Sequence, residues 1–377
     1  MKKWLIPVIA LVGVLAAITL AVTPIIKATP RGIPMALLNL DQAATVNGQS
    51  ENFGSTVVTN LTTSAAGLNL PVKWLMCTEQ ACVDNAMADN TVYASIVIPP
   101  DFTSTMAAAQ AGTSSTSPSQ ISVTINQGKN PAVAAVIASM MAQVSQAAGL
   151  AFNTTYINQI PADEGNGTPA TLLAVLMLFA SMITTIVLVN VIKVDFTRRA
   201  GRAKTILQQV GMAAGLAAVT ALVAPPIIGG LAGAKLPYWN LVVLIFIGFF
   251  AFATIVLLSV DWLGMRGLGI PVLILLLGIP ILALPYEALL TFWQNDVYPW
   301  VPQRFMIEGT RGVLFLGQKA FNSSVLWLAV TAVVGLALTF ASLTRAEARV
   351  AAVPTGKSTR AGKSGNPALN PDKARRN

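Results

Sequence analysis

The stretch TLLAVLMLFASMITTIVLVNVI, from Thr171 to Ile192, is followed directly by KVDFTRRAGRAK, from Lys193 to Lys204. The first part has no charged side chain and, as a helix, is long enough to cross a hydrocarbon core of about 30 Å. The second part places five cations beside a single acidic residue, Asp195; they are Lys193, Arg198, Arg199, Arg202 and Lys204. Basic clusters next to a membrane exit are retained on the cytoplasmic side. Together the two parts predict one membrane crossing and its orientation.

The composition indicates an integral membrane protein. The chain has 377 residues, of which 54% are hydrophobic and only 10% are charged, so it is too apolar for an ordinary soluble protein. The formal net charge of +9 is unevenly distributed, because residues 27–168 contain four basic and eight acidic side chains. The positive excess lies in the terminal segments and after Ile192. We interpret it as a topology signal and expect no nucleic-acid partner.

Six apolar runs divide the chain into predicted crossings. They are Leu5–Ile26, Thr171–Ile192, Met212–Leu231, Leu241–Val260, Leu268–Leu284 and Val325–Leu343. With both termini inside, the inner segments carry sixteen Lys and Arg residues and the longer outer segments carry eight. The sequence therefore predicts a multi-pass protein of a bacterial-type plasma membrane with cytoplasmic N- and C-termini.

Two features of the apolar runs bear on their structure. The first run could also be interpreted as a cleavable signal peptide. It is longer than a typical h-region, however, and no A-x-A-like site precedes Lys27, so we expect an uncleaved helix. Prolines interrupt two later runs. Pro225 and Pro226 should kink or unwind the outer end of the third run, and Pro271 and Pro280 should bend the fifth.

The segment between the first two crossings is predicted to be an extracytoplasmic α/β domain. Its predicted strands are Ile33–Leu40, Leu70–Cys77, Val92–Ile98 and Ile121–Asn126. Its helix candidates are Gly54–Ala66, Ala81–Ala88, Asp101–Ala111 and Asn130–Phe152. Gly112–Ser119 is a predicted flexible loop. The expected fold class is thus an α-helical integral membrane protein with six transmembrane helices and an α/β domain between helices 1 and 2.

The domain boundaries follow from these runs. We expect an N-terminal transmembrane helix over 1–26, the outer α/β domain over 27–168, a five-helix membrane domain over 169–344 and a disordered basic cytoplasmic tail over 345–377. The tail carries Gly-Lys-Ser sequences that lack the earlier glycine of a phosphate-binding loop, and a solvated segment that touches anionic lipid is the favoured interpretation.

Residue types that perform chemistry are scarce. The chain has no histidine, and its two cysteines, Cys77 and Cys82, are separated by four residues, which does not fit a zinc or redox motif. In an outer domain a disulfide is favoured over two buried free thiols. Because no catalytic set can be assembled from histidine, and the carboxylates of the outer segments are scattered, we expect no enzyme active site, metal or cofactor.

Residues 285–324 form an unusual outer element, because they lie outside by prediction yet are rich in aromatic and apolar side chains. Such an element should lie in the membrane interface or dip into the bilayer. It contains a candidate outer gate made of Glu287, Arg304, Glu308 and Arg311. Glu308 and Arg311 are three residues apart, and we predict that they pair on one helical face. The predicted spans contain no ionisable side chain, which disfavours a self-powered carrier.

Several short stretches resemble those of the phage infection protein (YhgE/Pip) family. ALLNLDQAATVNG (Ala36–Gly48) is similar to the first outer strand of that family and the loop after it, and VYASIVIPPDFTSTM (Val92–Met106) is similar to a strand of the family followed by an Ile-Pro and an Asp-Phe helix start. LPYEALLTFW with VPQRFMIEGTRGVLF (Leu284–Phe315) is similar to its element before the last span. One span, a large outer domain and then five spans is also the layout of membrane subunits of ABC-2 type exporters.

This resemblance implies a permease-like subunit that moves an amphipathic or lipid-like substrate outward. A separate ATPase would dock on the cations of Lys193–Lys204, and two copies or two related subunits would form the path. The alternative is a non-transporting cell-surface receptor or a secretion-machinery assembly protein that acts through its outer domain. In either case the membrane lipid is a partner.

Overall fold

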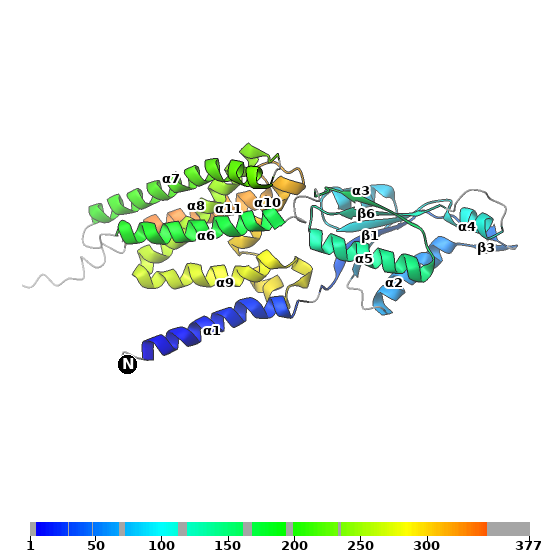
Figure 1. Ribbon diagram of the computed structural model, residues 1–377, viewed down its shortest axis with the longest axis horizontal. Coiled ribbons are helices and arrows are strands. Elements are labelled where there is room, and N and C mark those ends of the chain that lie inside the picture. The colour runs from blue at the N-terminus through cyan, green and yellow to red at the C-terminus, as the bar shows by residue number, and fades with distance from the viewer. Residues whose placement is uncertain are drawn as a thin grey trace, which may run out of the picture.

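The computed structural model describes residues 5–28, 30–46, 48–67, 72–111, 119–160, 168–193, 199–232 and 235–344. In these ranges the molecule is elongated, with a bundle of helices at one end and an α/β domain at the other (Figure 1). The loop predicted at Gly112–Ser119, apart from Ser119, and the tail predicted over 345–377 lie outside the described residues.

The α/β domain is built on a five-stranded mixed sheet. Its strand order is β4-β1-β5-β6-β7, and every neighbouring pair is parallel except β5 and β6. The strands are β1 (Ile33–Asn39), β4 (Val72–Cys77), β5 (Ala94–Ile98), β6 (Ile121–Asn126) and β7 (Phe152–Ile157). A separate antiparallel hairpin, β2 (Ala44–Val46) and β3 (Gln49–Glu51), follows β1.

Side-chain alternation along the central strands creates two cores, because successive residues of a strand point to opposite faces. Ile33, Met35 and Leu37 pack under α2 (Phe53–Gly67), α4 (Phe102–Gln110) and α5 (Pro131–Ala148). Ala36 and Leu38 point the other way and pack under α3 (Gln80–Ala88). Helices therefore lie on both faces of the sheet (Figure 1).

One predicted helix of this domain is shorter than its apolar pattern. The helix predicted over Asn130–Phe152 ends at Ala148, and Phe152 begins strand β7, which we did not predict. Gly149 causes the ending, because it adopts the left-handed conformation (φ 64°) that commonly terminates helices. The other predicted strands and helices of the domain lie within three residues of their observed ends.

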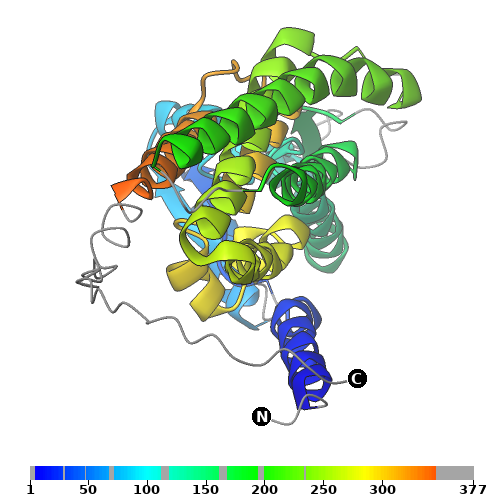
Figure 2. The same ribbon diagram turned by 90° about the vertical axis from the view of Figure 1, so that its left-hand side faces the viewer.

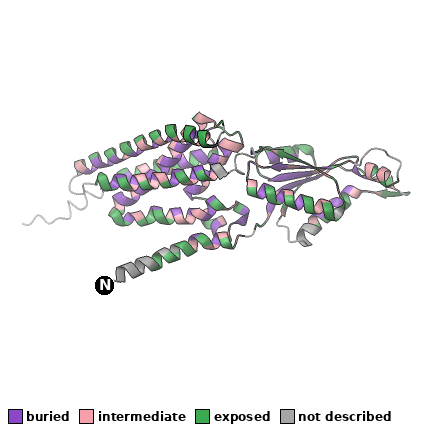
Figure 3. Cartoon of the chain, in the orientation of Figure 1, coloured by how far each residue is buried: buried purple, intermediate pink, exposed green. Residues whose placement is uncertain are grey.

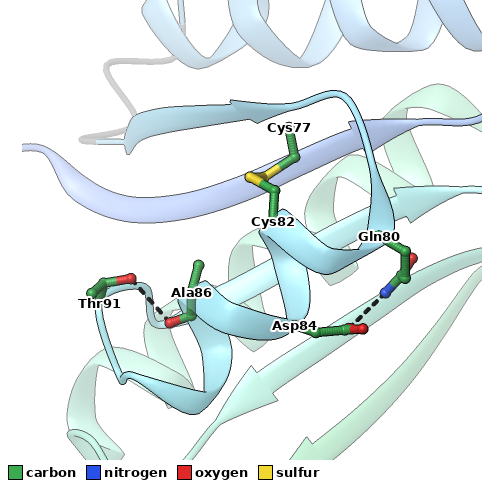
Figure 4. Close-up of a disulfide and its surroundings, with 6 residues drawn as sticks. All are labelled: Cys77, Gln80, Cys82, Asp84, Ala86 and Thr91. Atoms are coloured by element: carbon green, nitrogen blue, oxygen red, sulfur yellow. Dashed lines mark hydrogen bonds between the residues drawn. A yellow bond between two sulfur atoms is a disulfide. The ribbon is translucent and has the colours of Figure 1, made fainter.

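A disulfide joins Cys77 at the end of β4 to Cys82 in the first turn of α3 (Figure 4). This is the pairing favoured from the sequence. Gln80 and Asp84 are hydrogen-bonded across the same first turn (2.8 Å), and Thr91 donates to the Ala86 carbonyl at the other end of α3 (3.0 Å). The disulfide ties the start of α3 to the end of β4, whereas the two hydrogen bonds are local to α3 and the turn that follows it.

The helical bundle is organised around α8 (Tyr238–Leu263), which packs against its neighbours on several sides and is buried over much of its length. Around it lie α6 (Thr168–Val191), α7 (Arg199–Ala232) and α11 (Ser323–Ala341), which all contact it directly. The 3-10 turn η2 (Gly264–Leu268) leads from α8 into α9 (Gly269–Ala283). Seen end-on, α1 (Leu5–Ile26) lies at the edge of the bundle and packs against α9 (Figure 2).

Four segments of the described residues are long and apolar enough to cross a membrane. They are Ala170–Val191, Ala200–Leu231, Tyr238–Ala283 and Ser323–Ala341. Large hydrophobic side chains such as Val187, Ile227 and Val333 are more than half exposed. Exposed residues recur along the outer sides of the bundle helices (Figure 3). A belt of this kind is suited to lipid contact rather than to water. These observations indicate a membrane protein with an additional α/β domain.

Helix α7 differs from its prediction at both ends. It is helical through Pro225 and Pro226 up to Ala232, so of the predicted kink or unwinding at the outer end, the unwinding does not occur. It also begins at Arg199, well before the predicted span at Met212, so the second half of the basic connector is helical. Interior prolines are tolerated in membrane helices because neighbouring groups can satisfy the backbone carbonyl that they leave without a donor.

The predicted outer element enters the bundle instead of lying on its surface. It begins with two short turns, η3 (Tyr286–Ala288) and η4 (Trp293–Val297), and continues as α10 (Pro302–Phe315). Most of α10 is buried, and it packs against α6, α8, α9 and α11. The element is thus packed among the helices, and its predicted depth relative to the bilayer stays a prediction.

Candidate functional site

A cavity of about 560 Å³ lies where the α/β domain meets the bundle, next to α10. We call it the interdomain cavity. Its lining residues from the α/β domain are Asn90, Tyr93, Lys129 and Asn130. Its lining residues from the bundle are Ile281, Leu284, Pro285, Tyr286, Glu287, Gln294, Tyr298, Pro299, Arg304, Ile307, Glu308, Arg311, Leu316, Gln318, Ser323 and Ser324.

All four residues of the predicted outer gate line this cavity: Glu287, Arg304, Glu308 and Arg311. The last three lie on one face of α10, because residues four and seven positions apart share a face of a helix. The predicted pairing is wrong in one respect. Glu308 pairs with Arg304 (Nε to Oε1, 3.0 Å) one turn before it and not with Arg311. The Arg304 guanidinium also stacks over the Tyr298 ring, 4.3 Å from the ring centroid.

Glu308 accepts hydrogen bonds from three neighbouring donors. The Tyr298 hydroxyl donates to its Oε1, which also accepts from Arg304, and the Ser324 hydroxyl donates to its Oε2 (3.4 Å). Burial, followed by the nearby Glu308 charge, raises the pKa of Tyr298 well above its usual value. Tyr298 therefore stays protonated and acts as a donor to Glu308 at physiological pH.

Glu287 joins the bundle to the α/β domain. Its Oε2 accepts a hydrogen bond from the Tyr93 hydroxyl (2.9 Å), and its backbone carbonyl accepts one from the Arg31 backbone N–H (2.9 Å). Burial, followed by the charge of Glu287, raises the pKa of Tyr93 well above its usual value. The buried carboxylate and its phenol donor thus form a polar contact between the two parts of the chain.

Lys129 extends into the cavity from the loop between β6 and α5. Its ammonium donates to the backbone carbonyls of Asn90 and Thr91 (3.0 Å to the latter) and lies 4.4 Å from the centroid of the Tyr93 ring. Burial lowers the pKa of Lys129, and the charges of Glu287 and Glu308 partly oppose this change.

A set of asparagines shapes this loop. Asn126, which is fully buried at the end of β6, donates to Asn90 Oδ1 (2.6 Å) and accepts from Asn158 (3.0 Å) and from the Lys129 backbone N–H (3.2 Å). Asn90 and Asn158 both have positive φ (55° and 49°), a conformation that asparagine tolerates better than most residues. Gly128 packs so closely on Leu316 and Phe315 that an added Cβ would approach both to 3.0 Å.

Arg311 differs from the other cavity cations. In the described part of the chain, no hydrogen bond or ion pair of its guanidinium is present, although it is half-buried beside Tyr93, Tyr298 and Glu308. Burial lowers the pKa of Arg311, and these three neighbours partly oppose the change. The group remains charged because the pKa of arginine is normally above 12.

The predicted ATPase-docking cations are not equally accessible. Lys193 and Lys204 are exposed, whereas Arg202 is only 3% exposed and donates through a guanidinium nitrogen to the Asp261 backbone carbonyl (2.7 Å). Arg202 is therefore part of the packing between α7 and α8 and does not present its charge to a docking partner. Arg198 and the side chain of Arg199 lie outside the described residues.

Sequence reasoning missed the α/β side of the cavity. Nothing in the residues around Tyr93 or Lys129 marked them as facing the bundle. The one available signal was Lys129 itself, a rare cation in a domain with an excess of acidic residues. Among the described residues, no group of three or more His, Cys, Asp or Glu side chains could hold a metal ion.

Residues 6–216 match the family described as "Protein of unknown function (DUF3533)". The chain belongs to this family. The matched region extends from α1 through the α/β domain and α6 to the first half of α7, so it includes the α/β side of the cavity but not α10. No curated protein and no solved structure matches the chain.

Proposed function

We propose that this DUF3533 protein is the membrane subunit of an ABC-2 type exporter, which moves an amphipathic or lipid-like substrate outward with the help of a separate ATPase. The interdomain cavity is the observation that carries the proposal. It lies at one end of the apolar helices and combines charged groups with apolar ones such as Ile281, Leu284 and Ile307. A cavity of this volume is in the range of small-molecule sites.

The proposal includes six crossings: α1, α6, α7, α8, α9 and α11. The apolar segment Tyr238–Ala283 supports two of them, because 46 residues of helix are about twice the length that a bilayer requires. Its two helices fold back on each other at Gly264 (φ 66°), and both contact α10, through Gly248 to Met306 and Gly278 to Gln303. With both termini cytoplasmic, the α/β domain lies outside the plasma membrane.

The inner connector supports coupling to an ATPase. Lys193 and Lys204 are exposed, and the basic connector is the part of the chain that the proposed orientation places nearest to a cytoplasmic partner. The layout that resembles the phage infection protein family leads to the same proposal. Two copies, or this chain and a related one, would enclose the transport path.

Crosslinking in native membranes tests this function. A photoreactive residue in place of Lys193 or Lys204 should capture a nucleotide-binding subunit. The same residue in place of Lys235, which is an exposed lysine in the loop between α7 and α8, should not. If no inner position captures a nucleotide-binding subunit in the native host, the exporter proposal is rejected.

The alternative function is a receptor or assembly protein without transport. It is favoured by the α/β domain's own two cores and by the exposed apolar side chains Leu75 and Met76 on its edge strand β4. This alternative predicts that the domain, fused to an unrelated single-span anchor, keeps its function. Loss of function in the fusion would favour the exporter, whose cavity needs Glu287 and α10.

A further inference from the structure

The charged groups of the interdomain cavity are not balanced. Three cations, Lys129, Arg304 and Arg311, line it with two carboxylates, Glu287 and Glu308. Both carboxylates already accept hydrogen bonds from fixed donors, and Glu308 is paired with Arg304. Two cations therefore remain without a carboxylate partner among the described residues.

The two remaining cations differ in how they are held. The Lys129 ammonium is fixed by backbone carbonyls and by the Tyr93 ring, and it has no direct ion pair with a described residue, although the charges of Glu287 and Glu308 act on it from a distance. Arg311 has neither a hydrogen bond nor an ion pair to a described residue. A guanidinium that is half-buried and lacks an anion costs free energy, and a bound anion with two acceptor oxygens would remove that cost.

Two helix N-termini converge on the same cavity. Lys129 and Asn130 precede the first turn of α5, and Ser323 and Ser324 form the start of α11. The N-terminal end of a helix carries a partial positive charge of its backbone dipole. Both helices are long, so each adds to the positive potential that Lys129 and Arg311 create.

The apolar part of the lining indicates what is attached to the anion. Ile281, Leu284 and Ile307 line the cavity on its bundle side, between the charged face of α10 and the end of α9. These side chains also belong to the apolar clusters of the bundle, and together they form an apolar wall of the cavity that a free inorganic anion would not use. An amphiphile would place its headgroup at the cations and its chain along the bundle.

We propose that the interdomain cavity binds the phosphate headgroup of an anionic amphiphile, with Arg311 and Lys129 as its ligands. Arginine matches two phosphate oxygens at once, and Lys129 adds a point charge. This inference rests on the proposed function for the route that the amphiphile takes across the membrane. Binding itself needs no ATPase, so it can be measured on the purified full chain. Failure to bind the lipid would reject this inference, whereas failure to capture a nucleotide-binding subunit would reject the exporter function.

The test measures the affinity of the full chain in detergent for a single-chain phosphate monoester lipid. Arg311→Gln should weaken binding by about tenfold or more, the usual effect of losing one charge-assisted contact. Lys129→Gln should weaken binding as well, and Arg311→Lys should retain part of it. Lys319→Gln is the matched control, because Lys319 is exposed and adjacent to the lining residue Gln318 yet does not line the cavity.

Further arms distinguish the sources of the anion. A neutral lipid of the same chain length should bind more weakly than the phosphate lipid, and inorganic phosphate alone should compete only weakly. Equal binding of the neutral lipid, or unchanged affinity in both Arg311→Gln and Lys129→Gln, would overturn the proposal. Inorganic phosphate that binds as tightly as the lipid would overturn the amphiphile as ligand. If Arg311→Gln does not fold, Lys129→Gln and Arg311→Lys decide the outcome.

Discussion

At the scale of single residues, Tyr93 and Glu287 join the two parts of the molecule. They are 194 positions apart in the sequence, yet their side chains form a buried hydrogen bond. Glu287 is only 9% exposed, so its carboxylate depends on this donor. A buried carboxylate without a donor is much less favourable than one with a donor.

We therefore expect Tyr93→Phe to destabilise the protein. Loss of the hydroxyl leaves the ring packed but removes the donor to Glu287, at a cost of about 1 to 3 kcal/mol. Thermal unfolding of the purified protein in detergent measures the effect. Tyr156→Phe is the control. Tyr156 on β7 is 40% exposed, so removal of its hydroxyl should change the unfolding temperature little.

The pH dependence of stability tests the environment of Lys129. Burial lowers the pKa of Lys129 below 10.5, so between its folded pKa and 10.5 the unfolded chain binds more protons than the folded one. The contribution of Lys129 to stability therefore rises as pH increases through this window. Unfolding measured from pH 7 to 10 should show that Lys129→Gln lacks this rise. A difference between wild type and variant that stays constant with pH would contradict the expected shift.

The two sides of the cavity differ in how well they can be predicted from the sequence. Arg304, Glu308 and Arg311 are evident because they recur at helical spacing in an apolar element. Their pairing was predicted incorrectly, since stacking of Arg304 on Tyr298 depends on tertiary structure. The place of Tyr93 and Lys129 at the site could not be predicted, because only the packing of the α/β domain on α10 brings them there, even though Lys129 is a rare cation in its domain.

At the scale of elements, helix ends that are set by neighbouring residues can be predicted from the sequence. Asn130 and Pro131 mark the start of α5, and the structure shows Asn130 capping the backbone N–H groups of Ala132 and Val133. The end of α5 was missed because the apolar pattern continued beyond Gly149. Helix α7 is the converse case, because it stays helical through Pro225 and Pro226, two residues that act as helix breakers when only the local sequence is considered.

Close packing of α8 against α11 gives a prediction at this scale. A Cβ added to Gly335 would approach Thr254 Oγ1 to 2.5 Å and Thr254 Cβ to 2.8 Å, so the two helices would have to separate. Gly335→Ala should destabilise the bundle by about 1 to 3 kcal/mol. The control is Gly215→Ala in α7, where nothing lies within 4 Å of the added atom. A lower unfolding temperature for both variants alike would show that packing at Gly335 is not the cause.

At the scale of the whole molecule, the proposed function depends on which side of the membrane each part occupies. The α/β domain contains the disulfide, and disulfides persist in oxidising compartments outside the cytoplasm. The connector after α6 carries the basic cluster that is typical of the cytoplasmic side. Both observations agree with the same orientation, although they come from different parts of the chain and rest on different chemistry.

Labelling of single cysteines tests this orientation directly. In a Cys77→Ala, Cys82→Ala background, Thr59→Cys on α2 and Lys193→Cys after α6 each place one thiol at an exposed position. A membrane-impermeant maleimide should label Thr59→Cys in intact cells and Lys193→Cys only after lysis, because the bilayer separates the two sites. The reverse pattern would place the α/β domain in the cytoplasm. The interdomain cavity would then open toward the cytoplasm, and outward release of a phosphate amphiphile through it would be excluded.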